Sequence, residues 1–245
     1  MKRCLHFCLF FLIGSFSLNA QVCNYIVYDG FDYLPNSPLN ALSGGTGWLN
    51  TWSVQNGNTQ VPGFQSIPGS LSFGNLQTTG GSGSGGSSYL TAGRRLNNTS
   101  GGPFNAYLVN NDIGAAGTTL YMSVVLQKNQ NNNQPVWISL HNNNIDWCNN
   151  CASTQIQVGY FGSSSLVGGV RKWGLSVNGT VLNTNETVLP GVATLMILRF
   201  NFANPTTIDY WVNPPSIGNS NPMPTLSYTA ASSLAFRSLH CPEIS

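Results

Sequence analysis

The chain has 245 residues, of which 7% are Asp, Glu, Lys or Arg and 41% are hydrophobic. Charged residues make up about 25% of an ordinary soluble protein, and here thirty Asn and 27 Gly take much of their place. The formal net charge of +2 and the pI near 8.2 exclude a strongly basic platform for nucleic acid. The hydrophobic content is sufficient for a core, and the length suits one all-β domain.

The first twenty residues have the layout of a secretory signal peptide. Lys2 and Arg3 precede an apolar stretch over 5–13, and small and polar residues follow it. This stretch is shorter than the ~20 residues that cross a bilayer, so the pattern favours a cleaved signal peptide over a membrane anchor. We therefore expect a signal peptide over 1–20 and one domain over 21–245. The mature protein would be secreted, or held at the cell surface, without inserting into the membrane.

Four cysteines remain after the expected cleavage, at positions Cys23, Cys148, Cys151 and Cys241. Cysteines of exported proteins usually form disulfides. The close spacing of Cys148 and Cys151 favours a local disulfide, and half of a zinc site is the alternative. Cys23 and Cys241 lie near the two ends of the mature chain. A bridge between them would join the termini if the first and last strands are neighbours.

Alternation of apolar and polar residues predicts strands over 118–128, 136–141 and 154–161. In the first of these strands one face is apolar, with Leu120, Met122, Val124 and Leu126, and the other carries Tyr121, Ser123 and Gln127. A hairpin is predicted over 171–182, because Asn178-Gly179 suits a type I′ turn.

The clearest hairpin is predicted over 193–212, with a turn at 203–205. The apolar face would pair Phe202 with Thr206, Phe200 with Ile208, Leu198 with Tyr210 and Met196 with Val212. The opposite face would pair Arg199 with Asp209 and Ile197 with Trp211. Since a slip of one residue would invert every side chain, a register that suits both faces is a specific prediction.

No segment of a dozen residues shows the helical period, and Gly, Asn, Ser and Pro interrupt the chain throughout. The Gly/Ser-rich run over 80–88 and the Asn-rich run over 129–134 are predicted to be loops. We therefore expect an all-β fold of roughly ten to thirteen strands in a two-sheet antiparallel sandwich.

Four stretches resemble a module of secreted bacterial proteins. They are 28–33, 43–52, 68–76 and the strand end over 209–214. The module is assigned to the concanavalin A-like lectin/glucanase superfamily and is related to laminin-G-like domains. The resemblance implies a jelly roll of two curved antiparallel sheets. It implies no single activity, because this superfamily contains lectins, hydrolases, lyases and structural domains.

The acidic residues do not form a recognisable catalytic pair. Glycoside hydrolysis needs two carboxyl groups across the scissile bond, and no two acids lie two residues apart on a predicted strand. A jelly-roll lyase would need a Tyr/His pair, and His141 at a strand end is the one candidate base. We therefore expect no enzymatic activity and no catalytic residues.

Carbohydrate binding suits the composition better, because aromatic rings and amide or charged groups together recognise sugars. The first candidate face carries Trp211, Arg199, Asp209 and Asn201, opposite the apolar face of the second hairpin. Further ligand-binding candidates are Trp137 and Tyr160. Packing in the core or on a sheet surface is the alternative for any single aromatic residue.

No cofactor is expected, although related jelly rolls often hold a structural Ca²⁺. Asp29, Asp32 and Asp112 are weak candidates, since no loop has the dense oxygen-ligand spacing of a Ca²⁺ site. Three functions remain open: a glycan-binding module, a structural or adhesive extracellular protein, and an unrecognised polysaccharide hydrolase or lyase. The partner expected for the first is a glycan or polysaccharide.

Overall fold

The computed structural model describes residues 25–54, 64–74, 76, 78, 80–85, 91–143, 155–216 and 222–242. These residues form sixteen strands, joined by turns and two short 3-10 turns at Asn105–Tyr107 and Gly162–Ser165. All the strand pairs are antiparallel, so the expectation of an all-β antiparallel protein is confirmed. In the described part of the chain, no helix has the length and apolar character needed to cross a membrane.

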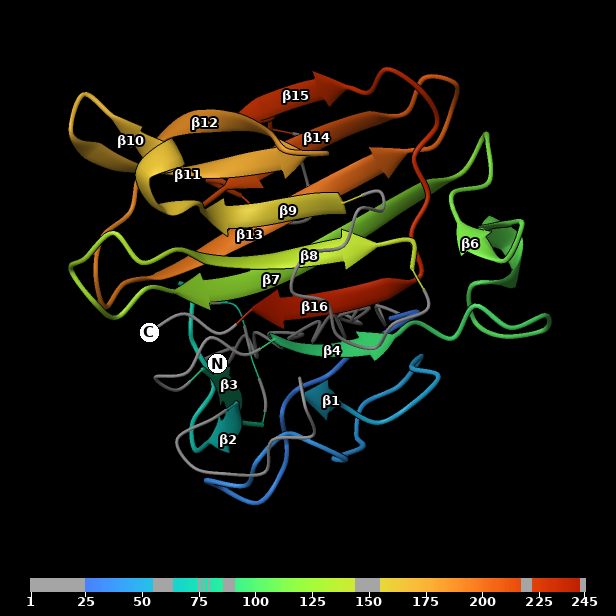
Figure 1. The fold of residues 1–245 in the computed structure, drawn as a ribbon, viewed down its shortest axis with the longest axis horizontal. Helices are drawn as coiled ribbons and strands as arrows, with labels where there is room; N and C mark the ends of the chain where they lie inside the picture. Colours follow the sequence, from blue (N-terminus) through green and yellow to red (C-terminus); the bar gives the residue numbers. More distant parts are fainter. Residues whose placement is uncertain are drawn as a thin grey trace, which may run out of the picture.

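The larger sheet lies in front in Figure 1. Its strand order is β1 (Ser53–Val54), β4 (Thr91–Arg95), β16 (Ser238–Pro242), β8 (Val136–His141), β9 (Gln155–Tyr160), β11 (Val170–Val177) and β10 (Leu166–Val167), and β12 (Thr180–Thr187) also pairs with β11. The turn between β11 and β12 has positive φ at Asn178 and Gly179, as the type I′ prediction requires. Val177 pairs with Thr180 and Leu175 with Leu182, so this hairpin is confirmed.

The smaller sheet lies behind the larger one in Figure 1 and has four strands. Their order is β15 (Leu226–Thr229), β14 (Thr207–Val212), β13 (Ala193–Asn201) and β7 (Thr119–Gln127). The register between β13 and β14 is the predicted one, from the Met196–Val212 pair to the Phe200–Ile208 pair. Two further pairs of short strands are β2 (Gln65–Ile67) with β3 (Ser82–Ser84) and β5 (Leu108–Val109) with β6 (Asp112–Ile113).

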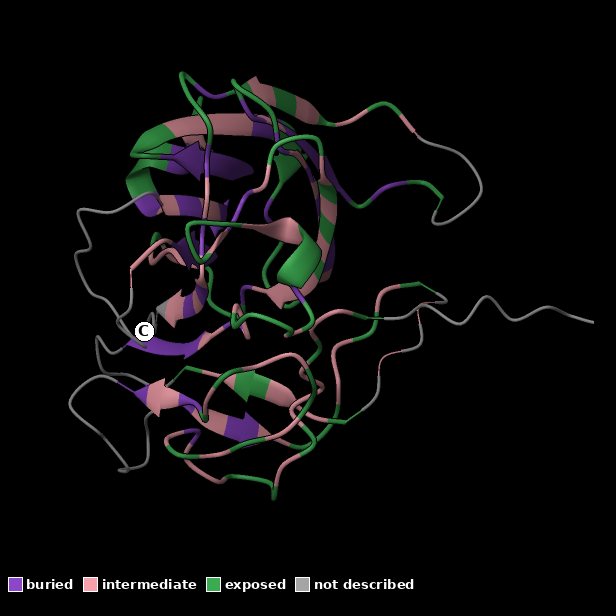
Figure 2. Ribbon diagram, turned by 90° about the vertical axis from the view of Figure 1, so that its right-hand side faces the viewer, coloured by how far each residue is buried: buried purple, intermediate pink, exposed green. Residues whose placement is uncertain are grey.

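The main core lies between these two sheets, which gives the protein a sandwich-like arrangement. Trp173 and Leu175 of β11 and Leu198, Phe200 and Tyr210 of the smaller sheet are buried in one cluster. Figure 2 shows the buried residues concentrated on the strands and the exposed residues on the turns. Burial of apolar surface on this scale is the main source of folding free energy.

A second, smaller core lies where the N-terminal part packs on β4 and β16. It contains Leu39, Trp52, Val54, Phe64 and Ala92, with Leu239 and Cys241 packed against it. This part is the lower region of Figure 1, around β1, β2 and β3. The stretches 28–33 and 43–52 therefore have a structural role in the protein.

The glycines of the 43–52 stretch are required by close backbone contact. Tyr28 and Thr46 form an antiparallel bridge, and Gly45 beside it has φ +67°. A Cβ on Gly45 would lie 1.8 Å from the carbonyl oxygen of Tyr28. Only glycine satisfies both the positive φ and this approach.

Two expectations about the fold need correction, and a condition stated for a bridge between the termini is not met. The sixteen strands exceed the expected ten to thirteen, because several of them have only two or three residues and leave no pattern in the sequence. Part of the predicted 80–88 loop is strand β3, whose Gly83 lies against Phe31: a Cβ there would be 2.8 Å from the ring. The strands β1 and β16 are not neighbours, since β4 lies between them.

Candidate functional site

A row of four facing side chains crosses the outer face of the smaller sheet. Tyr121 of β7 pairs with Arg199 of β13, Arg199 pairs with Asp209 of β14, and Asp209 pairs with Ser227 of β15. Residues directly opposite in antiparallel strands place their side chains on the same face. We call these four residues the Tyr121–Ser227 row.

The centre of the row is an ion pair that the hairpin register predicted. Arg199 donates to Asp209 Oδ2 from Nε at 3.0 Å and from Nη2 at 2.6 Å, and Ser227 Oγ donates to Asp209 Oδ1 at 2.6 Å. Burial acts to raise the pKa of Asp209, but the hydrogen bonds from Ser227 and Arg199 outweigh it, so this pKa lies below its ordinary value. Hydrogen bonds with Asp209 and Tyr121 raise the pKa of Arg199. Both side chains are therefore charged at neutral pH.

The exposed aromatic residue of this face is Tyr121, not Trp211. Tyr121 is 59% exposed, whereas Trp211 is 6% exposed. The indole Nε1 of Trp211 donates to the carbonyl of Pro222 at 2.9 Å, and the Arg199 guanidinium lies 5.6 Å from the Trp211 ring centroid. Trp211 is therefore a covered residue that contacts Arg199, whereas the Tyr121 ring is accessible to a ligand.

Asn201 extends the polar surface next to the row. Its side-chain nitrogen lies 3.2 Å from Thr207 Oγ1 and 3.5 Å from Asp209 Oδ2, and its side-chain oxygen accepts a bond from Thr119 at 3.3 Å. The candidate residues Arg199, Asp209 and Asn201 thus lie together, as the sequence predicted.

The outer face of the larger sheet carries a second polar group. Ser139 and His141 of β8 lie on one face with His240 of β16, which pairs with Ser139. Ser139 Oγ lies 2.8 Å from His141 Nε2, and the two imidazole rings stack with their centroids 4.3 Å apart. Trp137, another candidate, is half-buried on the same face of β8.

The burial of these histidines limits their chemistry. His141 and His240 are each 1% exposed and Ser139 is 3% exposed. Burial lowers the pKa of His141 to about 4, so its ring is neutral at physiological pH and is a weaker base than an ordinary histidine. A Ser–His pair is a nucleophile-and-base arrangement in acyl transfer, but here both groups lie beneath the surface.

The remaining sequence candidates lie elsewhere. Tyr160 is 0% exposed and belongs to the core, which corrects the expectation that it lies on a binding face; on β9 it has the same phase as the buried Ile156 and Val158.

The three calcium candidates do not form a site. The Asp29 carboxylate pairs with Arg94 Nη1 at 2.7 Å and accepts bonds from Trp52 and Tyr33. Asp112 pairs with Arg237, and Asp32 is exposed. Over the ranges that the structure describes, no three His, Cys, Asp or Glu residues are grouped to hold a metal ion.

The cysteine predictions are tested only at Cys241, which is a free thiol. Burial and the charge of Asp29 raise the pKa of the Cys241 thiol to about 12. Cys23, Cys148 and Cys151 lie outside the described residues.

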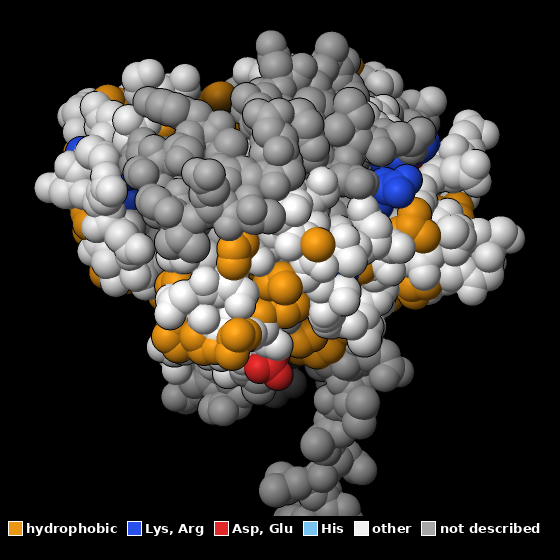
Figure 3. Space-filling view, turned by 60° about the horizontal axis from the view of Figure 1, so that its bottom comes forward, with side chains coloured by type: hydrophobic (Ala, Val, Ile, Leu, Met, Phe, Trp, Pro, Cys, Tyr) orange, Lys and Arg blue, Asp and Glu red, His pale blue; other side chains and the backbone are white. Residues whose placement is uncertain are grey.

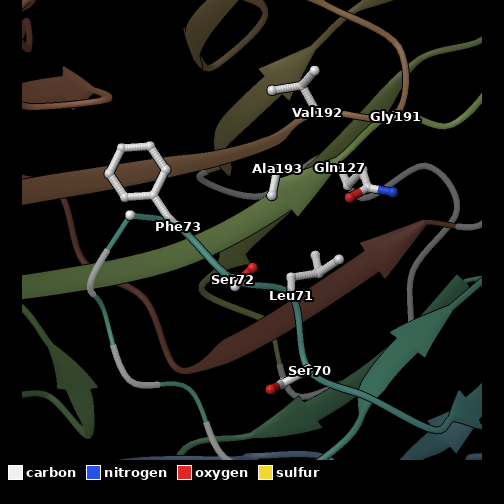
Figure 4. A pocket seen from close by; sticks show the side chains of 9 residues that line it. Ser70, Leu71, Ser72, Phe73, Gln127, Gly191, Val192 and Ala193 are labelled. Atoms are coloured by element: carbon white, nitrogen blue, oxygen red, sulfur yellow. The ribbon is translucent and has the colours of Figure 1, made fainter.

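A groove of about 440 Å³ lies where the smaller sheet meets the segment 70–74. Figure 4 shows Leu71 and Ser72 near Gln127 and Ala193, which pair across β7 and β13. No charged side chain lines this groove. The groove could therefore hold a ligand by its shape and by amide hydrogen bonds, but it supplies no acid or base.

The fold and the Tyr121–Ser227 row define a β-sandwich-like protein with a polar, aromatic-bearing sheet face. Comparison of the chain with models of protein families, with curated proteins and with solved structures finds no match. The resemblance of the four stretches to the concanavalin A-like superfamily remains a prediction. The function is consequently inferred from the residues of this chain.

Proposed function

We propose that this chain is a secreted, non-catalytic β-sandwich module that binds carbohydrate outside the cell or at the cell surface. The binding face would be the outer face of the smaller sheet, with Tyr121, Arg199, Asn201 and Asp209 as contact residues. The sheets would have the jelly-roll arrangement that the sequence resemblance implies. The Tyr121–Ser227 row is the observation that carries this proposal.

The row offers the two kinds of contact that a sugar needs. The exposed Tyr121 ring provides an apolar surface for one face of a pyranose. Next to it, the side chains of Arg199 and Asp209 are 28% and 12% exposed, and charged groups form the stronger hydrogen bonds to hydroxyls. Four strands at a spacing of about 4.8 Å give the row a length of about 14 Å, which suits a short oligosaccharide.

The same face does not support glycoside hydrolysis. Hydrolysis requires a second carboxyl group near the first, and among the described residues Asp209 is the one acid of the row. Both oxygens of Asp209 already accept hydrogen bonds. Because the row has no second carboxyl group, we propose binding without catalysis at this face.

A structural or adhesive role is the second candidate, and it is favoured by the N-terminal part. This region exposes four large hydrophobic side chains, with exposed fractions of 65% for Tyr25, 39% for Tyr28, 78% for Leu34 and 39% for Leu49. Figure 3 brings this region forward and shows hydrophobic side chains gathered with little charge among them. Exposed apolar patches are typical of association surfaces.

A glycan array with the purified 21–245 protein tests the proposal. We expect binding to at least one glycan, and an affinity reduced about tenfold, or ~1.4 kcal/mol, by Tyr121→Ala. The matched control is Tyr25→Ala, which removes another exposed tyrosine and should leave binding unchanged. Equal binding by the two variants would overturn the proposed face.

Experiments on the same purified protein also distinguish the other two functions. An empty array together with self-association in light scattering would favour the adhesive role. New reducing ends or unsaturated sugars, produced from a polysaccharide, would show a polysaccharide-active enzyme.

A further inference from the structure

At one end of the sandwich, two cations lie together with no carboxylate partner among the described residues. Lys128 follows β7, at the start of the loop that leads to β8, and Arg171 lies at the start of β11. In Figure 1 this loop and the start of β11 lie at the left end of the molecule. Neither residue belongs to the Tyr121–Ser227 row.

Lys128 is only 5% exposed, which is unusual for a lysine without a counter-ion. Its Nζ donates to Asn132 Oδ1 at 2.8 Å and to the carbonyl of Gln134 at 2.7 Å. It also lies 5.4 Å from the ring centroid of Tyr160. All of these partners are neutral.

Arg171 reaches the same loop from the other sheet. Its Nη1 donates to Asn131 Oδ1 at 2.6 Å and its Nε to Asn133 Oδ1 at 3.3 Å. Burial and the charge of Arg171 lower the pKa of Lys128, which shows that the two cations repel each other. The Asn-rich loop thus covers two neighbouring positive charges with amide oxygens.

Three other arginines among the described residues show what is missing here. Arg94, Arg199 and Arg237 each pair with an aspartate. Within the described residues, Lys128 and Arg171 pair with none. Amide dipoles compensate a buried charge only in part, and a buried charge without an ionic partner is costly.

The unused donors at this place converge on one kind of ligand. Lys128 has three N–H donors and Arg171 has five, and each of the two residues uses two of them on the loop. Because the amide oxygens of Asn131 and Asn133 point toward the cations, their NH₂ groups point away from them. The donors left for a ligand at this place are therefore those of Lys128 and Arg171 that the loop does not use.

We propose that Lys128 and Arg171, next to the side chains of Asn131 and Asn133, form a binding site for an oxyanion, that is, a carboxylate or sulfate group. Such a group would neutralise the two cations and take charge-assisted hydrogen bonds from the guanidinium. The oxyanion comes either from an acidic polysaccharide or from free inorganic sulfate. This site is separate from the proposed glycan-binding face and does not depend on it.

Thermal unfolding in millimolar sodium sulfate, against sodium chloride at equal ionic strength, tests the site. Sulfate also stabilises proteins by exclusion from their surface, so the comparison is between the 21–245 protein and its Arg171→Gln variant. We expect a sulfate-specific rise in Tm that Arg171→Gln removes and that Arg199→Gln, on the other face, leaves intact. An equal response of the starting protein and Arg171→Gln would overturn the proposal.

Asn133→Asp tests the same site without removing a cation. Asn133 is exposed, and the new carboxylate would act as an internal counter-ion for Arg171. We expect a higher Tm and a lost sulfate response in this variant; a retained response would contradict the site. Polygalacturonate, with dextran as the neutral control, then separates the two sources. Binding at least about tenfold tighter per carboxylate than sulfate assigns the site to an acidic polysaccharide, and equal binding assigns it to a free anion.

Discussion

Two Asp–Arg pairs of the same chemistry lie in opposite environments. Arg94 and Asp29 are 2.7 Å apart with side chains 3% and 5% exposed, whereas Arg199 and Asp209 are 2.6 Å apart with side chains 28% and 12% exposed. The first pair joins the N-terminal part to β4, and the second lies across β13 and β14. Distance alone therefore does not tell the two pairs apart; their surroundings do.

The buried pair has its hydrogen-bonding capacity filled by the protein. Asp29 Oδ2 also accepts bonds from Tyr33 at 2.8 Å and Trp52 at 2.9 Å, and Arg94 donates to the carbonyls of Gly44 and Asn50. In the surface pair, Asp209 also accepts bonds from Ser227 and Asn201, but the Arg199 side chain is 28% exposed and stays accessible. A saturated pair can hold two parts of a protein together, and an accessible one can bind a ligand.

Breaking the buried pair should have the largest effect on stability. Arg94→Met leaves the Asp29 carboxylate buried and unpaired, which costs about 3–5 kcal/mol. Urea unfolding measures this loss. The double variant Asp29→Asn/Arg94→Met removes both charges and should recover part of it. A loss below about 1 kcal/mol in the single variant would mean that the pair does not hold the N-terminal part.

The close backbone contact beside this pair gives the next largest effect. Gly45→Ala places a Cβ 1.8 Å from the Tyr28 oxygen at φ +67°, and we expect a loss of about 3 kcal/mol. Gly101→Ala is the matched control, because Gly101 also has positive φ, at +78°, but has open space around its Cβ. The control should cost about 1 kcal/mol. Similar losses in the two variants would argue against the Tyr28–Thr46 contact.

Acid should weaken the fold through His141. The pKa of His141 is about 4 in the folded protein, against an ordinary 6.5. When a histidine has a lower pKa in the folded protein, the fold has its full stability at pH values above the pKa of that histidine in the unfolded state. This stability is lost as the pH falls from the unfolded-state pKa toward the folded-state pKa. Between about pH 7.5 and pH 5 the free energy of unfolding should fall by about 2 kcal/mol. His141→Gln should flatten this part of the curve, and an unchanged slope would exclude His141 as its source.

The surface pair should have the smallest effect on stability. Arg199→Gln removes a partly exposed charge, and we expect a loss within about 1 kcal/mol, measured by the same urea unfolding. A loss as large as that of Arg94→Met would show that both pairs hold the fold, and the contrast between them would disappear.

The sequence predicts the fold best where one local hairpin constrains both faces. The register over 193–212, and with it the Arg199–Asp209 pair, follows from alternation and the turn. The pairing of Tyr121 with Arg199 does not, because β7 and β13 are far apart in the chain and nothing local selects β7 as the neighbour. For this reason the sequence indicates the polar face on which Tyr121 lies but does not identify Tyr121 as a ligand-binding candidate.

Covering segments and long-range neighbours explain the other differences. Trp211 has the phase of the outer face, but the segment that leads back to β15 brings the Pro222 carbonyl over it. The stacking of His141 on His240 depends on β8 lying beside β16, a pairing between distant parts of the chain. Cys241 lies in the second core, where its thiol packs against apolar residues.

The direct test of the account is the affinity of Arg199→Gln for the glycan that the array identifies, measured by calorimetric titration. The account predicts a protein with nearly full stability and an affinity at least about tenfold lower. Unchanged affinity in this stable variant would show that the outer face of the smaller sheet does not bind the glycan.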